Sequence, residues 1–327
     1  MMYSDFDLLC VEDAGLILAD ECTFSEYSLD LDLSPVDMEE SIAGFIEDEG
    51  DFVPGFDYPA RFSSSSLDAS ARQDSIAWIL KVHAIFKFQA VTAYLAINYL
   101  DRFLACRLLP QPNGWPLQLL SVACLSLAAK MEESLVPSLL DIQVGDAKFI
   151  FEPRTIRRME LLVLSALDWR LRSVTPFNFL HFFANKVDSK GTIMGFLIAK
   201  ATEIILMIMK EVNFLGHWPS VVAAAAILCA ADEIPNLSPV APGNAEAWCN
   251  GLSKDRVVSC YKLMQEVVVD NCPRTPPKTQ FPQFIRSVMA GSNDSDSSSS
   301  SSSSWSPLSN KRRKLNNWLT EDDEGKL

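Results

Sequence analysis

The 327-residue chain carries 42 Asp and Glu against 28 Lys and Arg, a formal net charge of −14. Residues 1–60 hold 17 acidic side chains and no Lys or Arg, so the remainder has a net charge of +3. Glycine contributes only 13 residues, which argues against glycine-cradled nucleotides and turn-rich β folds. The eight cysteines show no Cys-x-x-Cys spacing, which argues against a zinc site.

Residues 1–66 contain scattered apolar side chains without a sustained helical period. Such an acidic segment buries too little apolar surface to offset the entropy of ordering, so we predict a disordered arm. It lacks the basic start and apolar core of a secretory signal. Uncharged stretches elsewhere are shorter than the ~18 residues that span a bilayer. We therefore expect a soluble protein with no membrane partner.

Residues 67–172 carry apolar residues at helical spacing. Asp68 or Ser70 is placed to cap a helix whose Ile76 and Ile79 share one face. Residues 117–129 lack charge and are apolar all round, which indicates a helix enclosed by other helices. We predict five helices in this first domain, beginning near residues 68, 91, 117, 137 and 154.

A second domain of the same kind is predicted for residues 173–272. Trp115-Pro116 precedes the uncharged helix of the first domain, and Trp218-Pro219 precedes a second, Ala-rich uncharged run. Small side chains allow neighbouring helices to approach closely, so each run is expected at the centre of its domain. No stretch shows the alternation of a β-strand. We predict an all-α fold of two tandem five-helix domains.

Residues 273–327 are rich in proline and serine, with eight consecutive serines at Ser297–Ser304, and we predict that they are disordered. This tail contains a basic cluster of the kind that nuclear import receptors bind, although a solvated run of charge is the plain alternative. The cluster consists of Lys311, Arg312, Arg313 and Lys314. We expect a protein of the nucleus with a cytoplasmic pool.

Catalytic motifs are missing from the sequence. No Gly-x-Gly-x-x-Gly, Walker or Gly-x-Ser-x-Gly pattern occurs, and the three histidines are far apart. We therefore expect a binding protein without catalytic residues, cofactor or metal site.

Three strings carry a family resemblance. Residues 98–104 read Asn-Tyr-Leu-Asp-Arg-Phe-Leu, 127–133 read Leu-Ala-Ala-Lys-Met-Glu-Glu, and 158–164 read Arg-Met-Glu-Leu-Leu-Val-Leu. In this order they resemble a cyclin box, and Leu8-Leu9-Cys10-Val11-Glu12 adds a resemblance to plant D-type cyclins, most like their group-one members. The resemblance implies two cyclin folds in a regulatory subunit, which is not itself an enzyme. Such a subunit binds and activates a cyclin-dependent kinase to promote the G1/S transition.

The resemblance also assigns roles within the first domain. It implies that Lys130 and Glu160 grip the kinase's regulatory helix and that Leu119 lies near this interface. A lysine at a helix C-terminus suits the role because its long side chain can reach a partner's carbonyl groups. Solvated charges and a core leucine are the plain alternatives. Arg72 and Asp101 match a pair that ties the first helix of the box to the second, against the alternative of two surface charges.

Many cyclins have a substrate-docking patch that begins Met-Arg-x-Ile-Leu and continues to a Trp. The matching residues here are Ala71-Arg72-Gln73-Asp74-Ser75 and Trp78, so Asp74 replaces an apolar anchor. A carboxylate adds a desolvation cost to an apolar groove. We therefore expect weakened docking of Arg-x-Leu peptides at this patch.

Leu8, Cys10 and Glu12 occupy alternate positions and would share one face of an extended peptide. Main-chain hydrogen bonds and alternate side-chain pockets are a recurring mode of peptide recognition. We expect this motif to bind a retinoblastoma-related pocket protein, with chance occurrence as the alternative. Kinase-inhibitor proteins are a further class of partner that the resemblance suggests.

A general-transcription-factor-like protein with the same tandem helical fold is the alternative function. It would bind DNA and polymerase, and would need a basic DNA-facing surface and usually a zinc ribbon. Residues 61–290 carry a net charge of only +4 without a dense basic stripe, so we expect no direct contact with nucleic acid. An unusual helical enzyme would instead need clustered polar groups in a pocket.

Overall fold

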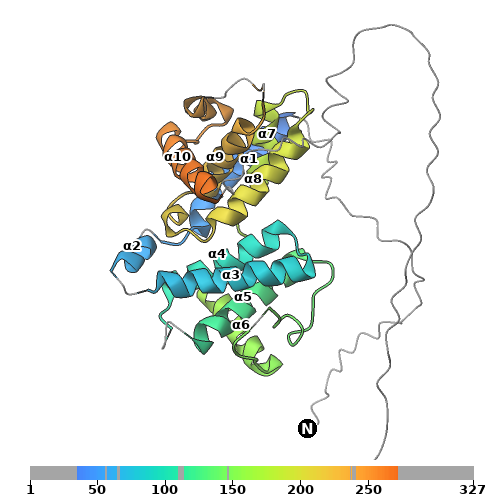
Figure 1. The fold of residues 1–327 in the computed structure, drawn as a ribbon, viewed down its shortest axis with the longest axis vertical. Coiled ribbons are helices and arrows are strands. Elements are labelled where there is room, and N and C mark those ends of the chain that lie inside the picture. The colour runs from blue at the N-terminus through green and yellow to red at the C-terminus, as the bar shows by residue number, and fades with distance from the viewer. Residues whose placement is uncertain are drawn as a thin grey trace, which may run out of the picture. The chain divides into compact units, whose positions relative to one another are not determined.

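The computed structural model describes residues 35–55, 57–64, 67–109, 114–145, 147–235, 237 and 241–271. Helices are the only regular elements within these ranges (Figure 1). The α-helices are α1 (Pro35–Asp48), α2 (Asp57–Ser63), α3 (Ala69–Phe86), α4 (Ala90–Cys106), α5 (Trp115–Glu132), α6 (Pro153–Ala166), α7 (Phe177–Val187), α8 (Met194–Ile208), α9 (Pro219–Asp232) and α10 (Lys254–Asn271). Three 3-10 helices accompany them, η1 (Glu49–Phe52), η2 (Val212–Phe214) and η3 (Pro242–Trp248). The predicted all-α class is confirmed.

The first domain is built around α5, of whose 18 residues 13 are buried. Its N-terminus follows Gly114, whose φ of 102° favours glycine, and Pro116 occupies the first turn. Because α5 is apolar all round, α3, α4 and α6 can all pack against it. Of the two predicted caps of α3, Asp68 is the one that caps it, accepting hydrogen bonds from the backbone N–H groups of Ser70 and Ala71.

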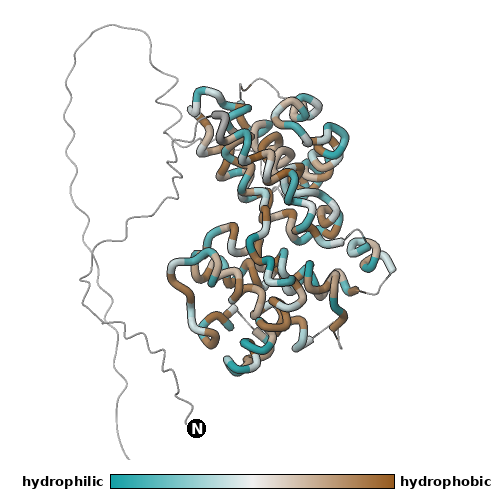
Figure 2. The backbone as a smooth tube through the Cα atoms, turned by 180° about the vertical axis from the view of Figure 1, so that it is seen from behind, coloured by the Kyte–Doolittle hydropathy of each residue, from teal (hydrophilic) through white to brown (hydrophobic). Residues whose placement is uncertain are grey.

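The second domain repeats this plan around α9. Residues 223–226 of α9 are four alanines without exposed surface, so α7, α8 and α10 can approach its backbone closely. Figure 2 shows hydrophobic residues along the helices of both domains. Each domain has its own core of buried apolar side chains. The predicted tandem arrangement, with an uncharged helix at each centre, is confirmed.

The count of five helices per domain was wrong. Within the described parts of 67–172 and 173–271, each domain has four α-helices. The segment after Pro137, which we predicted to be a short helix, forms turns. Its Ser138 hydroxyl bonds the Asp141 carboxylate at 2.6 Å and accepts the Asp141 backbone N–H at 3.2 Å. Such local bonds compete with a helical ladder. In the second domain, the 3-10 helix η2 lies between α8 and α9, and η3 lies between α9 and α10.

The prediction that the disordered arm extends to residue 66 was also wrong, because residues 35–64 contain α1, η1 and α2. Ile42 of α1 belongs to the second domain's core, while Tyr58 of α2 belongs to the first domain's core. A sequence signal for α1 was present. Met38, Ile42, Phe45 and Ile46 follow the i, i+4, i+7, i+8 spacing of an apolar helix face.

The acidic side chains of this segment have partners far along the chain. Glu39 pairs with Lys186 at 3.2 Å, and Asp51 pairs with Arg170 at 2.7 Å. Such exposed pairs contribute little stability each. The burial of Ile42 and Tyr58 supplies the larger stabilisation.

Residues 1–34 and 272–327 lie outside the described residues, so the predicted disorder of both termini stays a prediction. Across the described ranges, no helix combines the length and apolarity needed to cross a membrane. The same ranges contain no group of three His, Cys, Asp or Glu side chains that could hold a metal ion.

Candidate functional site

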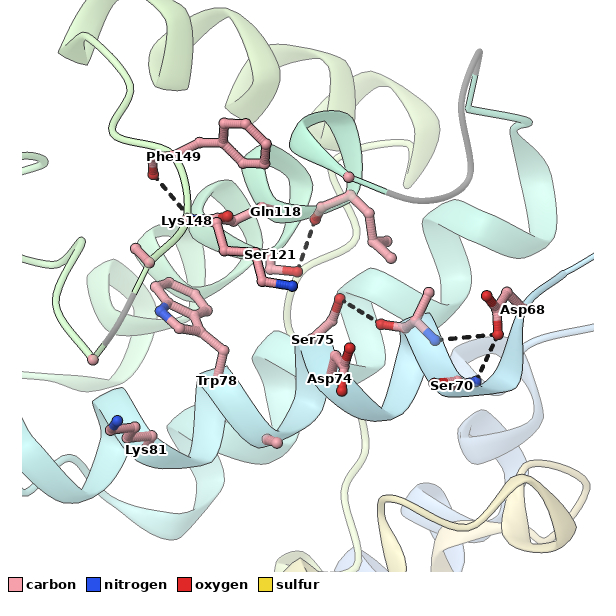
Figure 3. Close-up of a pocket in the computed structure, with 16 residues that line it drawn as sticks. Asp68, Ser70, Asp74, Ser75, Trp78, Lys81, Gln118, Ser121, Lys148 and Phe149 are labelled. Atoms are coloured by element: carbon pink, nitrogen blue, oxygen red, sulfur yellow. Dashed lines mark hydrogen bonds between the residues drawn. The ribbon is translucent and has the colours of Figure 1, made fainter.

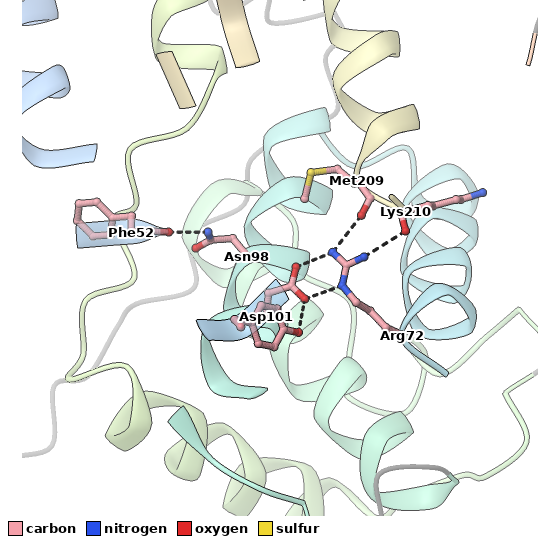
Figure 4. Close-up of polar contacts among 7 residues, drawn as sticks. Phe52, Arg72, Asn98, Asp101, Met209 and Lys210 are labelled. Carbon is pink, nitrogen blue, oxygen red and sulfur yellow. Dashed lines mark hydrogen bonds and ion pairs between the residues drawn. The ribbon is translucent and has the colours of Figure 1, made fainter. Parts of the chain in front are cut away.

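A buried ion pair centred on Arg72 joins the two domains (Figure 4). Its Nε and Nη2 atoms donate to the two carboxylate oxygens of Asp101 on α4, each at 2.8 Å. The two side chains are only 2% and 3% exposed. Arg72 also donates to the carbonyl oxygens of Met209 at 3.1 Å and Lys210 at 3.2 Å, just after α8. One guanidinium therefore connects α3, α4 and the second domain.

Tyr58 of α2 completes this network by donating its hydroxyl to Oδ1 of Asp101 at 2.7 Å. Burial raises the pKa of Tyr58, and the Asp101 carboxylate raises it further. Burial alone would lower the pKa of Arg72, but the carboxylate of Asp101 raises it on balance. The guanidinium of Arg72 thus stays charged and bonded to Asp101 in the protein interior.

Phe52 of η1 lies between two guanidinium groups. The Cζ atoms of Arg102 and Arg170 are 5.4 Å and 5.1 Å from its ring centroid, within the range of cation–π contacts. Its carbonyl oxygen accepts a hydrogen bond from Nδ2 of Asn98 at 2.8 Å (Figure 4). These contacts hold the N-terminal segment against the first domain.

A second ion pair, Lys130–Glu160, lies at the surface of the first domain. Lys130 is in the last turn of α5, and its Nζ is 2.7 Å from Oε1 of Glu160 on α6. The lysine side chain is 43% exposed and the glutamate side chain 8%. An ammonium group has three donors and a carboxylate has two oxygens, so the pair retains groups that can bind a partner.

Exposed apolar side chains adjoin this pair in the sequence. Met131 follows Lys130 and is 37% exposed, and Leu161 follows Glu160 and is 58% exposed. Leu135, just beyond the end of α5, is 86% exposed. Exposed apolar surface of this kind marks interaction sites when it is contiguous. The combination suits a polypeptide that offers both main-chain polar groups and apolar side chains.

The second domain lacks the lysine. Asp232 stands at the end of α9, the position that corresponds to Lys130 at the end of α5. Its carboxylate accepts hydrogen bonds from Tyr261 and Gln265 of α10. A lysine at the end of the central helix is therefore present in the first domain and not at the corresponding position of the second.

A groove of about 510 Å³ runs along α3 (Figure 3). Asp74, Trp78 and Lys81 follow each other at i, i+4, i+7 spacing and line it, and Lys148 and Gln118 belong to other parts of the wall. Trp78 is anchored by a 2.9 Å hydrogen bond from Nε1 to the Val144 carbonyl oxygen. Asp74 and Lys81 lie on either side of Trp78, so the groove presents opposite charges around one aromatic ring.

Two family profiles match the chain. The profile described as "Cyclin, N-terminal domain" matches residues 40–172, and "Cyclin, C-terminal domain" matches residues 174–303. The chain belongs to the cyclin family. The N-terminal match begins at residue 40, inside α1, which agrees with the folded state of residues 35–64.

The cyclin has plant relatives of the D type. It is 55% identical to Cyclin-D1-1 of Arabidopsis thaliana, with 98% of this chain and 94% of the relative covered. It is 48% identical to Cyclin-D2-1 of Oryza sativa subsp. japonica, with 82% and 85% covered. Among solved structures, a viral cyclin from herpesvirus saimiri shares the fold with a TM-score of 0.54 at 16% identity, with 62% of this chain and 86% of the viral chain covered. The resemblance to plant D-type cyclins is confirmed.

Membership of the family settles the class of function. Cyclins are regulatory subunits of kinases and not enzymes, as the resemblance implied. The cyclin's partner is accordingly a cyclin-dependent kinase, and the alternative of a general-transcription-factor-like protein has no support.

The cyclin's structure brings some of the predicted residues together and separates others. Arg72 contacts Asp101, and Lys130 contacts Glu160, although their roles stay predictions. Leu119 is 4% exposed and precedes Lys130 by 11 residues on α5, about 16 Å along the helix axis. It belongs to the core and to another groove, so it does not join the Lys130–Glu160 pair.

The docking patch is divided in a similar way. Asp74 and Trp78 line the groove along α3, whereas the Arg72 side chain turns into the interior and bonds Asp101. The pocket-protein motif of Leu8, Cys10 and Glu12 and the cluster from Lys311 to Lys314 lie outside the described residues. The contacts of Phe52 and Tyr58 were not predicted, because both residues fall in the segment predicted to be disordered.

Proposed function

We propose that this cyclin binds its kinase through the face that carries Lys130 and Glu160 and thereby promotes the G1/S transition. The observation that carries the proposal is the 2.7 Å pair itself, half-exposed on the lysine side and adjoined by exposed apolar residues. Lys130 has two further donors for carbonyl groups at the end of the kinase's regulatory helix. Glu160 retains a second carboxylate oxygen for main-chain N–H groups.

The mechanism is activation by positioning. The kinase helix, held on this face, would complete the Lys–Glu pair of the kinase's own ATP site. The cyclin can hold the helix firmly because α5, on which Lys130 stands, is buried on nearly all sides. It shifts the kinase towards the active state to the extent that it binds that state more tightly.

The test is the double variant Lys130→Ala, Glu160→Ala. Charge-assisted hydrogen bonds contribute about 1.5–3 kcal/mol each, so loss of two should weaken kinase binding by at least about 100-fold. Co-purification with the kinase and histone-kinase activity measure the loss. The control variant, Lys200→Ala with Glu233→Ala, removes an ion pair of the second domain whose nitrogen and oxygen atoms are 3.1 Å apart. It should retain both kinase binding and histone-kinase activity. Full kinase binding and activity in the double variant Lys130→Ala, Glu160→Ala would exclude this face as the kinase-binding site.

We also propose that the motif Leu8, Cys10, Glu12 recruits a retinoblastoma-related protein. Attachment of the motif to the kinase-bound chain would raise the effective concentration of the pocket protein near the kinase. Cys10→Gly should abolish pocket-protein binding in a pull-down from purified components. Cys22→Gly, in the same acidic segment, should leave it unchanged. Equal binding by the two variants would refute the assignment.

The cluster from Lys311 to Lys314 is proposed to direct import into the nucleus. Replacement of its four residues by Ala should lower the nuclear-to-cytoplasmic ratio of a fluorescent fusion. The control replaces three exposed basic residues of the folded domains, Lys148, Arg172 and Lys190. A nuclear ratio equal to that of the wild-type fusion would remove the cluster from the proposal.

A further inference from the structure

A second groove, distinct from the one along α3, lies between α4, α5 and α6. It measures about 450 Å³ and is lined mainly by apolar side chains. Leu108, Trp115 and Leu162 line it and are 77%, 50% and 57% exposed. Large apolar side chains that gather at one site mark a binding surface, and Trp is among the residues that most often dominate binding energy.

This groove lies on a different side of α6 from the kinase-binding face proposed above. An α-helix turns by about 100° per residue, so Leu162 lies about 200° around α6 from Glu160. Arg158, which also lines the groove, lies about 160° from Glu160 in the same direction, so it is only about 40° from Leu162. On α6, a ligand in the groove and a kinase on the Lys130–Glu160 pair therefore contact different sides.

The rim of the groove is positively charged. Arg107 and Arg158 line it, and Arg154 and Arg157 stand beside Arg158 in the first half of α6. The first turn of α6 has no acidic residue, and Arg154 in that turn stands at the end of the helix dipole that disfavours a cation. Among the described residues, Arg107, Arg154, Arg157 and Arg158 form no ion pair. The groove thus suits a ligand that is both apolar and acidic.

We propose that residues 1–34 of this chain, the N-terminal arm, bind in the groove. The arm holds nine acidic residues and no Lys or Arg, together with apolar clusters at Leu8-Leu9 and Leu16-Ile17-Leu18. The groove along α3 fits the arm less well, because Asp68 and Asp74 line it. The C-terminal tail fits less well because it carries the cluster from Lys311 to Lys314.

The attachment of the arm at Pro35 makes this contact intramolecular. Thirty-four residues reach at most about 110 Å, whereas a folded body of this size is roughly 45 Å across. The arm is therefore long enough to reach the groove. Covalent attachment raises its effective concentration there, so even a weak contact would be occupied. The arm would cover an apolar surface that a competing partner could uncover.

The experiment uses the full chain with p-benzoylphenylalanine in place of Leu108. After irradiation at low protein concentration, we expect an internal cross-link at monomer mass whose peptides map to residues 1–34. The matched control places the same photo-reactive group at Leu135, another exposed apolar position, 86% exposed. Its yield of cross-links to the arm should be at least fivefold lower.

Charge reversal tests whether the arginines of the groove attract the acidic arm. Arg107→Glu with Arg158→Glu should lower the yield from position 108 at least fivefold. Lys148→Glu with Lys190→Glu, which changes the net charge equally at exposed sites, should leave it within twofold. Circular dichroism confirms that each variant is folded. Cross-links that map to the tail, a dimer-mass product, or a yield no greater than that of the Leu135 control would overturn the proposal.

Discussion

The carboxylate of Glu49 caps the N-terminus of α9 by accepting hydrogen bonds from the backbone N–H and the hydroxyl of Ser220, both at 2.7 Å. The two residues are 171 positions apart and both are buried. Burial raises the pKa of Glu49, and the hydrogen bonds from Ser220 oppose that rise without cancelling it. The contact ties the N-terminal segment to the central helix of the second domain.

Glu49→Gln should remove a pH dependence of stability. The pKa of Glu49 in the folded state lies above the ordinary value of 4.5. The folded protein therefore binds more protons than the unfolded chain between 4.5 and the raised pKa, and this contribution to the free energy of unfolding falls as pH rises through that window. Urea denaturation in steps upward from about pH 4.5 should show wild type losing stability relative to Glu49→Gln. A difference independent of pH would contradict the raised pKa.

Asp101→Asn should destabilise the protein strongly. It leaves Arg72 charged and without its ion-pair partner in a site where both side chains are almost completely buried, at a cost of about 3–5 kcal/mol. Replacing both residues, Arg72→Met with Asp101→Leu, removes the unpaired charge and should cost less than Asp101→Asn alone. Urea denaturation measures the free energy of unfolding of the single and the double variant. A double variant less stable than the single one would show that the bonds of Arg72 to Met209 and Lys210 dominate.

Lys130→Ala with Glu160→Ala should separate binding from stability. The lysine is 43% exposed, so solvent screens the pair and its contribution to folding is small. We expect the free energy of unfolding to change by less than about 1 kcal/mol, while kinase binding is lost. A large fall in the midpoint of urea denaturation would instead assign the pair a structural role.

Ala225→Leu should destabilise the second domain. Ala225 has no exposed surface at the centre of α9, and added methylene groups would displace α7, α8 or α10. Overpacking of this kind costs about 1–3 kcal/mol. Ala77→Leu on the exposed face of α3 is the control and should change the unfolding free energy by less than about 0.5 kcal/mol. Equal effects of the two substitutions would contradict close packing around α9.

Local sequence patterns were sufficient for the helical class, the two central helices and the cap at Asp68. These depend on periodicity, on missing charge and on a side chain two or three residues from its partner, all of which are visible along the chain. The pairing of Arg72 with Asp101, 29 residues away, was predicted only through the family resemblance. The pairing of Lys130 with Glu160, 30 residues away, was not predicted and is shown by the structure.

The tertiary structure decided the state of residues 35–64. Their acidic composition indicated disorder, but Glu49, Asp51 and Tyr58 bond Ser220, Arg170 and Asp101, respectively. No window of local sequence contains both members of such a contact. The sequence by itself therefore determined the all-α class and which helix each domain encloses. Only long-range burial and hydrogen bonding decided that α1, η1 and α2 belong to the folded cyclin.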